Sequence, residues 1–139
     1  MKILRTDEEF RDSIFRILRS KPSYFYLSTF NISINSEVLE MLKLMKGIKN
    51  TKVIIGLANP STKQLVYLRN TFRDNKIPVK LVTDFHMKSV VSNDRAIIGG
   101  RNLTKSGWID LSFEVLSQKE ISKMKREFDS IYKNLKSIL

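Results

Sequence analysis

Hydrophobic residues in the first 83 positions follow two alternating patterns. Short runs of apolar, aromatic and β-branched residues predict strands, whereas apolar residues spaced three or four apart behind a capping residue predict helices. Short connections between these elements imply right-handed crossovers and a largely parallel sheet. The predicted strands are residues 24–30, 52–57 and 78–82, and the predicted helices start at a capping box in residues 6–9, at Asn35 or Ser36, and at the turn 59–62, the first two ending near Arg19 and Gly47.

The pattern changes after Thr83. Two short apolar runs, residues 88–92 and 96–98, flank a tight turn and predict a hairpin, and residues 111–116 predict a last strand. From Gln118 onward, apolar residues recur at helical spacing, which predicts one amphipathic helix on the sheet; a coiled-coil seam is the alternative. We therefore expect a single domain over residues 1–139, of α/β class, with a mixed, largely parallel β-sheet flanked by helices.

The charge balance favours a polyanionic partner. The 139 residues include 25 Lys and Arg against 14 Asp and Glu, a formal net charge of +11. A basic domain gains affinity for nucleic acid because each neutralised phosphate releases condensed counterions. The alternatives are lysines that serve solubility alone, or an anionic membrane surface.

Other functional classes are excluded by what the chain lacks. It has no cysteine and one histidine, which excludes disulfides, thiolate metal sites and a zinc site of His ligands within one chain. We expect no metal and no cofactor. The first residues are too charged for a signal peptide and no apolar run is long enough to span a bilayer, so we expect a soluble, cytoplasmic protein that does not bind membranes.

Candidate chemistry concentrates in residues 86–104. His86 and Lys88 lie two apart on a predicted strand, which places both side chains on one face, and the hairpin returns the chain so that Asn102 can reach them. An imidazole, an ammonium and an amide suit a phosphodiester: His can attack phosphorus or shuttle a proton, while Lys and Asn stabilise the non-bridging oxygens. A carboxylate behind the imidazole would fix its tautomer.

This segment resembles the HxK motif of the phospholipase D-like superfamily. The family pattern continues through an Asp to Gly-Ser-x-Asn, and here the tail reads Gly-Gly-Arg-Asn over residues 99–102. The family also carries an acidic residue on a following strand, where this chain has Glu114. The resemblance covers roughly residues 24–116 and implies a phospholipase D-like fold with the catalytic residues His86, Lys88, Asn102 and Glu114.

Two positions depart from the family pattern. Asn93 stands where the family has Asp, with Asp94 next to it, so either the turn is rearranged and Asp94 serves, or that carboxylate is absent. Gly100 replaces the Ser of the tail, which removes a hydroxyl but keeps a backbone N–H able to face a phosphate. Asn93, Asp94 and Gly100 are therefore candidates for a supporting role.

The family mechanism requires two facing motifs, one His forming a phosphohistidine and the other protonating the leaving oxygen. This chain has one motif, so the resemblance is to the short nucleases in which a symmetric homodimer joins two copies. It implies a metal-independent nuclease, with Lys88 of both copies supplying the electrostatic stabilisation.

Several residues near the motif are candidates for contacts with DNA or RNA. Arg95, Arg101 and Lys105 can line a groove for the backbone, and Trp108 either stacks on a base or anchors the loop. Three alternatives stay open: a catalytically impaired nucleic-acid-binding or dimerisation module, a phospholipid phosphodiesterase, and the cleavage domain of a larger restriction or repair system, since nothing in the chain marks a sequence-reading element.

Overall fold

A central β-sheet with helices on both faces is built from elements that alternate along the chain. The computed structural model describes residues 2–99 and 111–139. In chain order the elements are β1 (Lys2–Leu4), α1 (Asp7–Arg19), β2 (Tyr24–Phe30), α2 (Ser36–Lys46), β3 (Asn50–Leu57), α3 (Thr62–Asp74), β4 (Val79–Thr83), β5 (Ser89–Ser92), β6 (Ala96–Gly99), β7 (Ser112–Val115) and α4 (Gln118–Asn134).

The sheet is mixed, and the expectation of a largely parallel sheet is wrong. Its order is β1-β7-β6-β5-β2-β3-β4. Only β2–β3 and β3–β4 pair in parallel, whereas the other four pairings between described strands are antiparallel. The reason is that the chain leaves β4 at one edge, returns to the free side of β2, and continues there as a hairpin. The short strand β1, which the sequence pattern did not predict, then pairs antiparallel with β7.

Capping contacts confirm the predicted starts of the helices. The side chains of Thr6, Asn35, Ser61 and Ser117 each accept a hydrogen bond from a backbone N–H in the first turn of the following helix. The last helix packs on its own sheet through Ile121 and Phe128, so the amphipathic interpretation is correct. None of the helices in the described part of the chain is long and apolar enough to cross a membrane.

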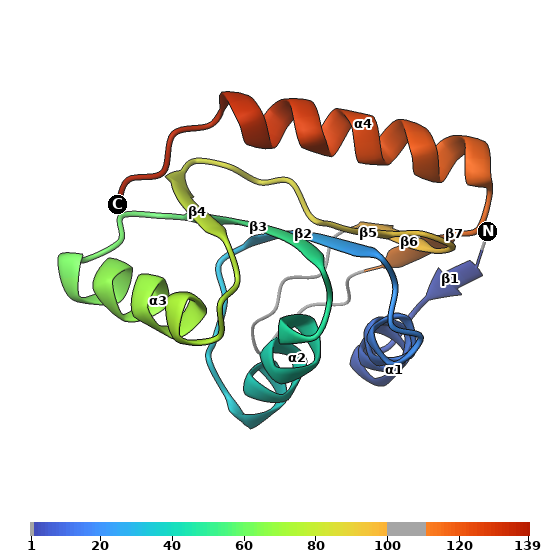
Figure 1. Ribbon diagram of the computed structural model, residues 1–139, viewed down its shortest axis with the longest axis horizontal. Coiled ribbons are helices and arrows are strands. Elements are labelled where there is room, and N and C mark those ends of the chain that lie inside the picture. The colour runs from blue at the N-terminus through green and yellow to red at the C-terminus, as the bar shows by residue number, and fades with distance from the viewer. Residues whose placement is uncertain (1, 100–110) are drawn as a thin grey trace.

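The sheet separates two hydrophobic cores. Figure 1 shows α4 above the sheet and α1, α2 and α3 below it. Alternation along β2 divides its side chains between the two sides: Phe25 and Leu27 pack toward α1 and α2, whereas Tyr24 and Tyr26 pack toward α4. Each face of β2 is therefore buried, which explains its almost continuous apolar sequence.

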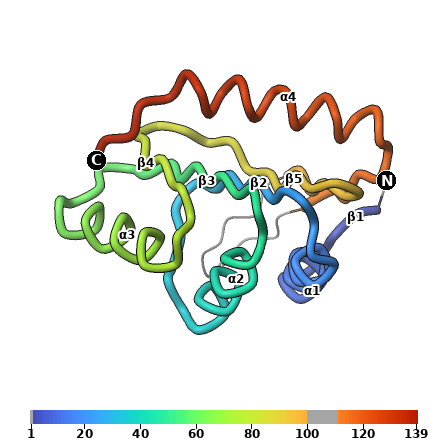
Figure 2. The backbone as a smooth tube through the Cα atoms, in the orientation of Figure 1, coloured from blue at the N-terminus to red at the C-terminus, as the bar shows by residue number. Residues whose placement is uncertain are grey.

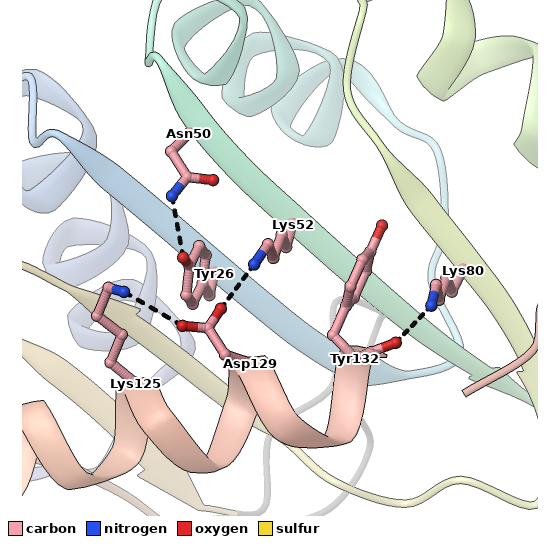
Figure 3. A network of polar contacts seen from close by, with 7 residues as sticks. All are labelled: Tyr26, Asn50, Lys52, Lys80, Lys125, Asp129 and Tyr132. Carbon is pink, nitrogen blue, oxygen red and sulfur yellow. Dashed lines mark hydrogen bonds and ion pairs between the residues drawn. The ribbon is translucent and has the colours of Figure 1, made fainter. Parts of the chain in front are cut away.

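A polar network fixes α4 to the sheet (Figure 3). Asp129 accepts hydrogen bonds from Lys52 on β3, at 2.6 Å, and from Lys125 one turn earlier, at 3.2 Å. Near the end of the helix, Lys80 on β4 donates to the backbone carbonyls of Tyr132 and Leu135. These contacts bridge α4 to the two outer parallel strands, so they set the position of the helix across the sheet.

The network shifts the ionisation of its members. Burial alone would raise the pKa of Asp129, but the hydrogen bonds from Lys52 and Lys125 lower it overall. Burial would lower the pKa of Lys52, but the bond to Asp129 and the nearby Tyr26 raise it. The bond to Asp129 also raises the pKa of Lys125. All three groups are therefore charged at neutral pH.

The connection from β4 to β5 crosses the sheet in direct contact with it. Gly56 of β3 lies in register with Phe30 of β2 and Val82 of β4. A Cβ at Gly56 would lie 1.8 Å from the carbonyl oxygen of Phe85, closer than any real contact. Val82 and Phe85 both belong to the core under α4, so the crossing takes place on that face. Figure 2 shows the connecting tube passing between the sheet and α4.

Gly56→Ala is expected to lower the free energy of unfolding by about 1 to 3 kcal/mol, because the backbone of Phe85 must move away from the sheet. Gly47→Ala is the matched control, since a Cβ there meets only the Leu44 carbonyl oxygen at an ordinary 3.6 Å. Urea unfolding of the three proteins measures the difference. Equal stabilities for both variants would show that the crossing is not in contact with β3.

Asp129→Asn is expected to lower the free energy of unfolding at neutral pH by roughly 0.5 to 1 kcal/mol, the range for a partly exposed ion pair screened by solvent. The folded-state pKa of Asp129 is lowered from 3.8, so its contribution is present above that value and is lost as the pH falls through the folded-state pKa. Urea unfolding at neutral and strongly acidic pH should show the difference between the two proteins shrinking in acid. Exposed Asp74, replaced in the same way, is the control; an Asp129 effect that is independent of pH would contradict the ion pair.

Candidate active site

The sequence-predicted His86 and Lys88 lie at the end of the crossing connection. The expectation that both stand on a strand is wrong, because β5 begins at Ser89, one residue after Lys88. The connection must first pass over the ends of β3 and β2 before it can pair with β2. Lys88 extends the ladder, since its carbonyl accepts a hydrogen bond from the N–H of Gly99.

The imidazole of His86 is exposed and is held by an aromatic contact. It stacks on the ring of Phe30 at the end of β2, with ring centroids 4.1 Å apart and planes 24° apart. Among the described residues, no hydrogen bond involves the His86 ring. The imidazole is therefore oriented by Phe30 while its edges stay open to solvent. Phe30 is a residue that the sequence analysis missed; its only signal was an aromatic side chain at a strand end.

Lys88 immediately precedes β5 and lines a hollow on each side of the sheet. It lines a small cavity together with Phe10 of α1, Thr29 of β2 and Ser112 of β7. It also lines a groove of about 460 Å³ on the α4 side, beside Met87. Lys88 therefore contributes to hollows on both sides of the sheet, at the start of the strand that follows His86.

The small cavity contains a hydroxyl that the sequence analysis also missed. The Oγ atom of Ser112 is buried and has no hydrogen-bond partner among the described residues. Ser112 on β7 pairs with Gly99 on β6, and the Gly99 N–H donates a hydrogen bond to the Lys88 carbonyl oxygen. Ser112 is therefore two strands away from the chain segment that contains Lys88. A buried hydroxyl left unpaired costs free energy, so Ser112 is available to donate to an oxygen near Lys88. Its signal in the sequence was a position two residues before Glu114 on the same strand.

Gly99, the first glycine of the family-like tail, is required by backbone geometry. Its φ is +137°, which L side chains rarely adopt. A Cβ there would also lie 2.6 Å from the Leu111 carbonyl oxygen and 2.7 Å from the Ser112 Cα. Only glycine allows β7 to approach β6 at this point, beside the cavity.

Glu114 is buried on β7 and is bound by groups other than His86. Its Oε2 accepts a hydrogen bond from Ser13 of α1 at 2.6 Å. Its Oε1 lies 3.3 Å from Nη1 of Arg95, an ion pair that lacks hydrogen-bond alignment. No hydrogen bond between described residues joins Glu114 to His86. The carboxylate thus ties α1 and the β5–β6 turn to β7, and a catalytic role for it stays a prediction.

The β5–β6 turn lies at the end of the hairpin opposite Lys88. There the side-chain Oδ1 of Asn93 accepts hydrogen bonds from the backbone N–H groups of Ser23, at 2.8 Å, and Tyr24. The side-chain Nδ2 of Asn93 donates to the Ser23 hydroxyl. An Asp at this position would offer the same acceptor oxygen to those two N–H groups. The difference between Asn93 and the Asp of the family pattern therefore lies at a contact that holds the start of β2. Asp94 is exposed and accepts a long bond from Gln118.

The remaining predicted residues divide into two groups. Arg95 belongs to the turn and pairs with Glu114, so the structure does not bring it to the end that His86 and Lys88 share. Its predicted contact with nucleic acid stays a prediction. Those of the predicted site residues that lie outside the described ranges are Gly100, Arg101, Asn102, Lys105 and Trp108. Within those ranges, no group of three or more His, Cys, Asp or Glu is placed to hold a metal ion.

Comparisons with known proteins relate the chain to solved structures. No protein-family model and no curated protein matches it. Nuc from Salmonella typhimurium, described as a phospholipase D family member, superposes with a TM-score of 0.77 at 14% identity, covering 98% of this chain and 97% of Nuc. NucT from Helicobacter pylori superposes with a TM-score of 0.67 at 12% identity, covering 99% and 98% of the two chains. The fold of this chain is phospholipase D-like. The expectation drawn from the motif is confirmed at the level of the fold.

A third similar structure belongs to a protein of another kind. TrmBL2, an archaeal chromatin protein whose structure is described as showing a novel mode of DNA binding, has a TM-score of 0.70 at 8% identity. The match covers 99% of this chain and 52% of TrmBL2. The phospholipase D-like fold therefore does not by itself decide between cleavage and binding.

Phe30→Ala is expected to release His86, with a loss of about 0.5 to 1.5 kcal/mol for the aromatic pair. Because the chain has one histidine, its ring protons give an unambiguous pair of NMR signals. In the native protein the ring current of Phe30 should displace these signals from those of a free imidazole, and the substitution should return them to it. Tyr67→Ala on α3, an exposed aromatic residue, is the control. Native signals that already match a free imidazole would show that the stack does not form.

Proposed function

We propose that this chain is a metal-independent phosphodiesterase that cleaves DNA or RNA at an active site shared by a homodimer. The observation that carries the proposal is an exposed imidazole, stacked on Phe30, beside Lys88 at one end of a phospholipase D-like sheet. Structures of nearly the same length, Nuc and NucT, support the assignment to the nucleases of this fold. The net charge of +11 suits a polyanionic substrate.

In the proposed mechanism, His86 attacks phosphorus and forms a P–N bond as the P–O bond to the leaving group breaks. The partner's His86 donates a proton to that leaving oxygen. Water then attacks the phosphohistidine, gives its proton to the partner's His86, and releases the phosphate as the P–N bond breaks. Lys88 of both copies, and Asn102, are assigned to the non-bridging oxygens, whose charge they stabilise.

The proposed mechanism requires a homodimer. Two imidazoles are required, and the chain has one histidine. His86 is exposed in the isolated protomer. A residue that meets a second copy across a two-fold axis has to be accessible in this way. We assign no metal, because lysines and imidazoles carry the electrostatic and proton-transfer roles. Contacts of Arg101 and Lys105 with the nucleic-acid backbone, and stacking of Trp108 on a base, complete the proposal.

Phospholipid hydrolysis is a second candidate, favoured by one observation. The groove beside Lys88 is largely apolar, with Met87, Met124 and Ile131 along it. Two carboxylates, Glu120 and Glu127, line the same groove. A lipid that entered this groove would bring its phosphate close to both carboxylates, which would repel it. A nucleic acid could approach His86 and Lys88 from outside the groove, so we favour nucleic acid.

The proposal predicts cleavage of labelled single- or double-stranded DNA or RNA in excess EDTA. His86→Ala should lower the rate at least about 10³-fold, because both steps lose the nucleophile and the proton donor, while binding is retained. Asn93→Asp is the control: it lies at the far end of the hairpin and should leave the rate within about twofold. The same proteins are assayed on phosphatidylcholine vesicles.

Three outcomes would contradict the proposal. Nucleic acid that is bound but never cut, in the native protein and in His86→Ala alike, would identify a binding module of the kind that the likeness to TrmBL2 suggests. Cleavage that persists in His86→Ala would place the chemistry elsewhere. Hydrolysis of vesicle lipid, without cleavage of any nucleic acid, would select the phospholipid candidate.

A further inference from the structure

The outer face of α4 carries a line of cations that the proposed active site does not use. Lys119, Lys123, Arg126 and Lys133 are spaced four, three and seven residues apart, which places them on one side of a helix. All four side chains are exposed. Between them on the same side lie only small polar residues such as Ser130. The structure describes α4 throughout, and no acidic residue falls on this line.

The acidic residues of α4 are confined to its two flanks. Glu120 and Glu127, seven residues apart, line the apolar groove beside Met124. Asp129 lies on the opposite flank and is bound by Lys52 and Lys125. Glu127 lies one turn from Lys123 and Asp129 one turn from Lys133. Among the described residues, however, no ion pair joins a carboxylate to any of the four cations of the outer line, and Asp129 is engaged by Lys52 and Lys125.

The flank next to Asp129 adds further positive charge (Figure 3). Lys52, Lys80 and Lys125 lie over the faces of tyrosine rings: Lys80 is 4.3 Å from the centroid of Tyr132 and Lys52 is 4.9 Å from that of Tyr26. Asp129 is the one carboxylate that Lys52 and Lys125 share. These partly exposed ammonium groups extend the cationic surface from the outer line of α4 over β3 and β4.

The dimensions of the line fit a nucleic-acid backbone. At a rise of 1.5 Å per residue, Lys119 and Lys133 lie roughly 21 Å apart along the axis. Each strand of a duplex carries one phosphate for about every 3.4 Å of the duplex axis, so this length corresponds to about six base pairs. Four cations along that length can each neutralise a phosphate without reading a base.

An anionic membrane fits this helix less well. A helix that binds a membrane surface inserts its apolar face into the lipid, but the apolar face of α4 is buried against the sheet through Ile121 and Phe128. The outer side of the helix, which faces away from the sheet, is polar. An extended polyanion that contacts cations alone is therefore the better match.

We propose that the outer face of α4 is a nucleic-acid-binding surface that contacts backbone phosphates through Lys119, Lys123, Arg126 and Lys133, outside the His86–Lys88 site. It lies on the side of the helix that faces away from the sheet, whereas the connection that carries His86 runs beneath the helix (Figure 1). The surface holds nucleic acid whether or not the chain cleaves it.

The test compares two variants that lose the same charge. The first replaces Lys119, Lys123, Arg126 and Lys133 by Gln. The matched control replaces four exposed lysines on and after α2 and on α3, which cover the opposite face of the sheet: Lys43, Lys46, Lys49 and Lys63. Both carry His86→Ala to prevent cleavage, so the result is independent of the proposed enzymatic activity. Circular dichroism and thermal unfolding confirm that each variant folds.

Fluorescence anisotropy with a labelled 30-base-pair duplex, over a series of salt concentrations, gives the affinity and its salt dependence. Each lost phosphate contact lowers the slope of log K against log salt by about 0.9. The α4 variant should therefore lose about 3 to 4 from the slope and at least tenfold in affinity, whereas the control should change less than about twofold. Equal weakening of both variants, or an unchanged α4 variant, would overturn the proposal. Binding to anionic vesicles that is lost in the α4 variant, with duplex binding intact, would overturn it in favour of a membrane.

Discussion

The contact between Gly56 and the backbone of Phe85 is the constraint on which the candidate site depends. The chain leaves β4 at the edge of the sheet and must reach the far side of β2, so it has to pass over β3. A side chain at Gly56 would occupy the position of the Phe85 carbonyl. The crossing changes the direction of the sheet from parallel to antiparallel, and it delivers His86 onto the ring of Phe30. Sheet topology and site geometry therefore have one cause.

The two ends of the β5–β6 hairpin differ in how their polar groups are engaged. Near Lys88, the imidazole of His86 is exposed and the buried hydroxyl of Ser112 has no hydrogen-bond partner among the described residues. At the turn, by contrast, Asn93 ties down the start of β2, and Arg95 compensates the buried Glu114. A buried carboxylate without such partners would be strongly destabilising. Asn93 and Arg95, which lie close in sequence to His86 and Lys88, therefore make structural contacts at the far end of the hairpin.

The sequence predicts local structure better than it predicts this geometry. Helix caps such as Asn35 and the buried strand β2 were predictable because a capping residue and a run of apolar, aromatic and β-branched residues are local signals. The direction of the sheet was not, because the crossing depends on a contact between Gly56 and Phe85 that is distant in sequence. The same limit applies to the site. The HxK spacing identified His86 and Lys88, but it gave no indication of Phe30, which belongs to a strand more than fifty residues earlier. The partners of Glu114 were hidden for the same reason, since Ser13 lies on the first helix.

The charges of α4 are arranged so that one helix meets three different environments. Its apolar side closes a core through Phe128, and its lysine–aspartate flank binds the outer strands through Lys52. Glu120 and Glu127 face the groove beside Lys88. An ion pair or a core contact constrains a residue from within the protein, but no ion pair within residues 2–99 and 111–139 involves the outer line of cations. Four like charges along one side repel one another and cost stability. The alignment of four exposed cations on one side of the helix, with the carboxylates on its flanks, is therefore the feature that internal packing leaves unexplained, and an external polyanion would account for it.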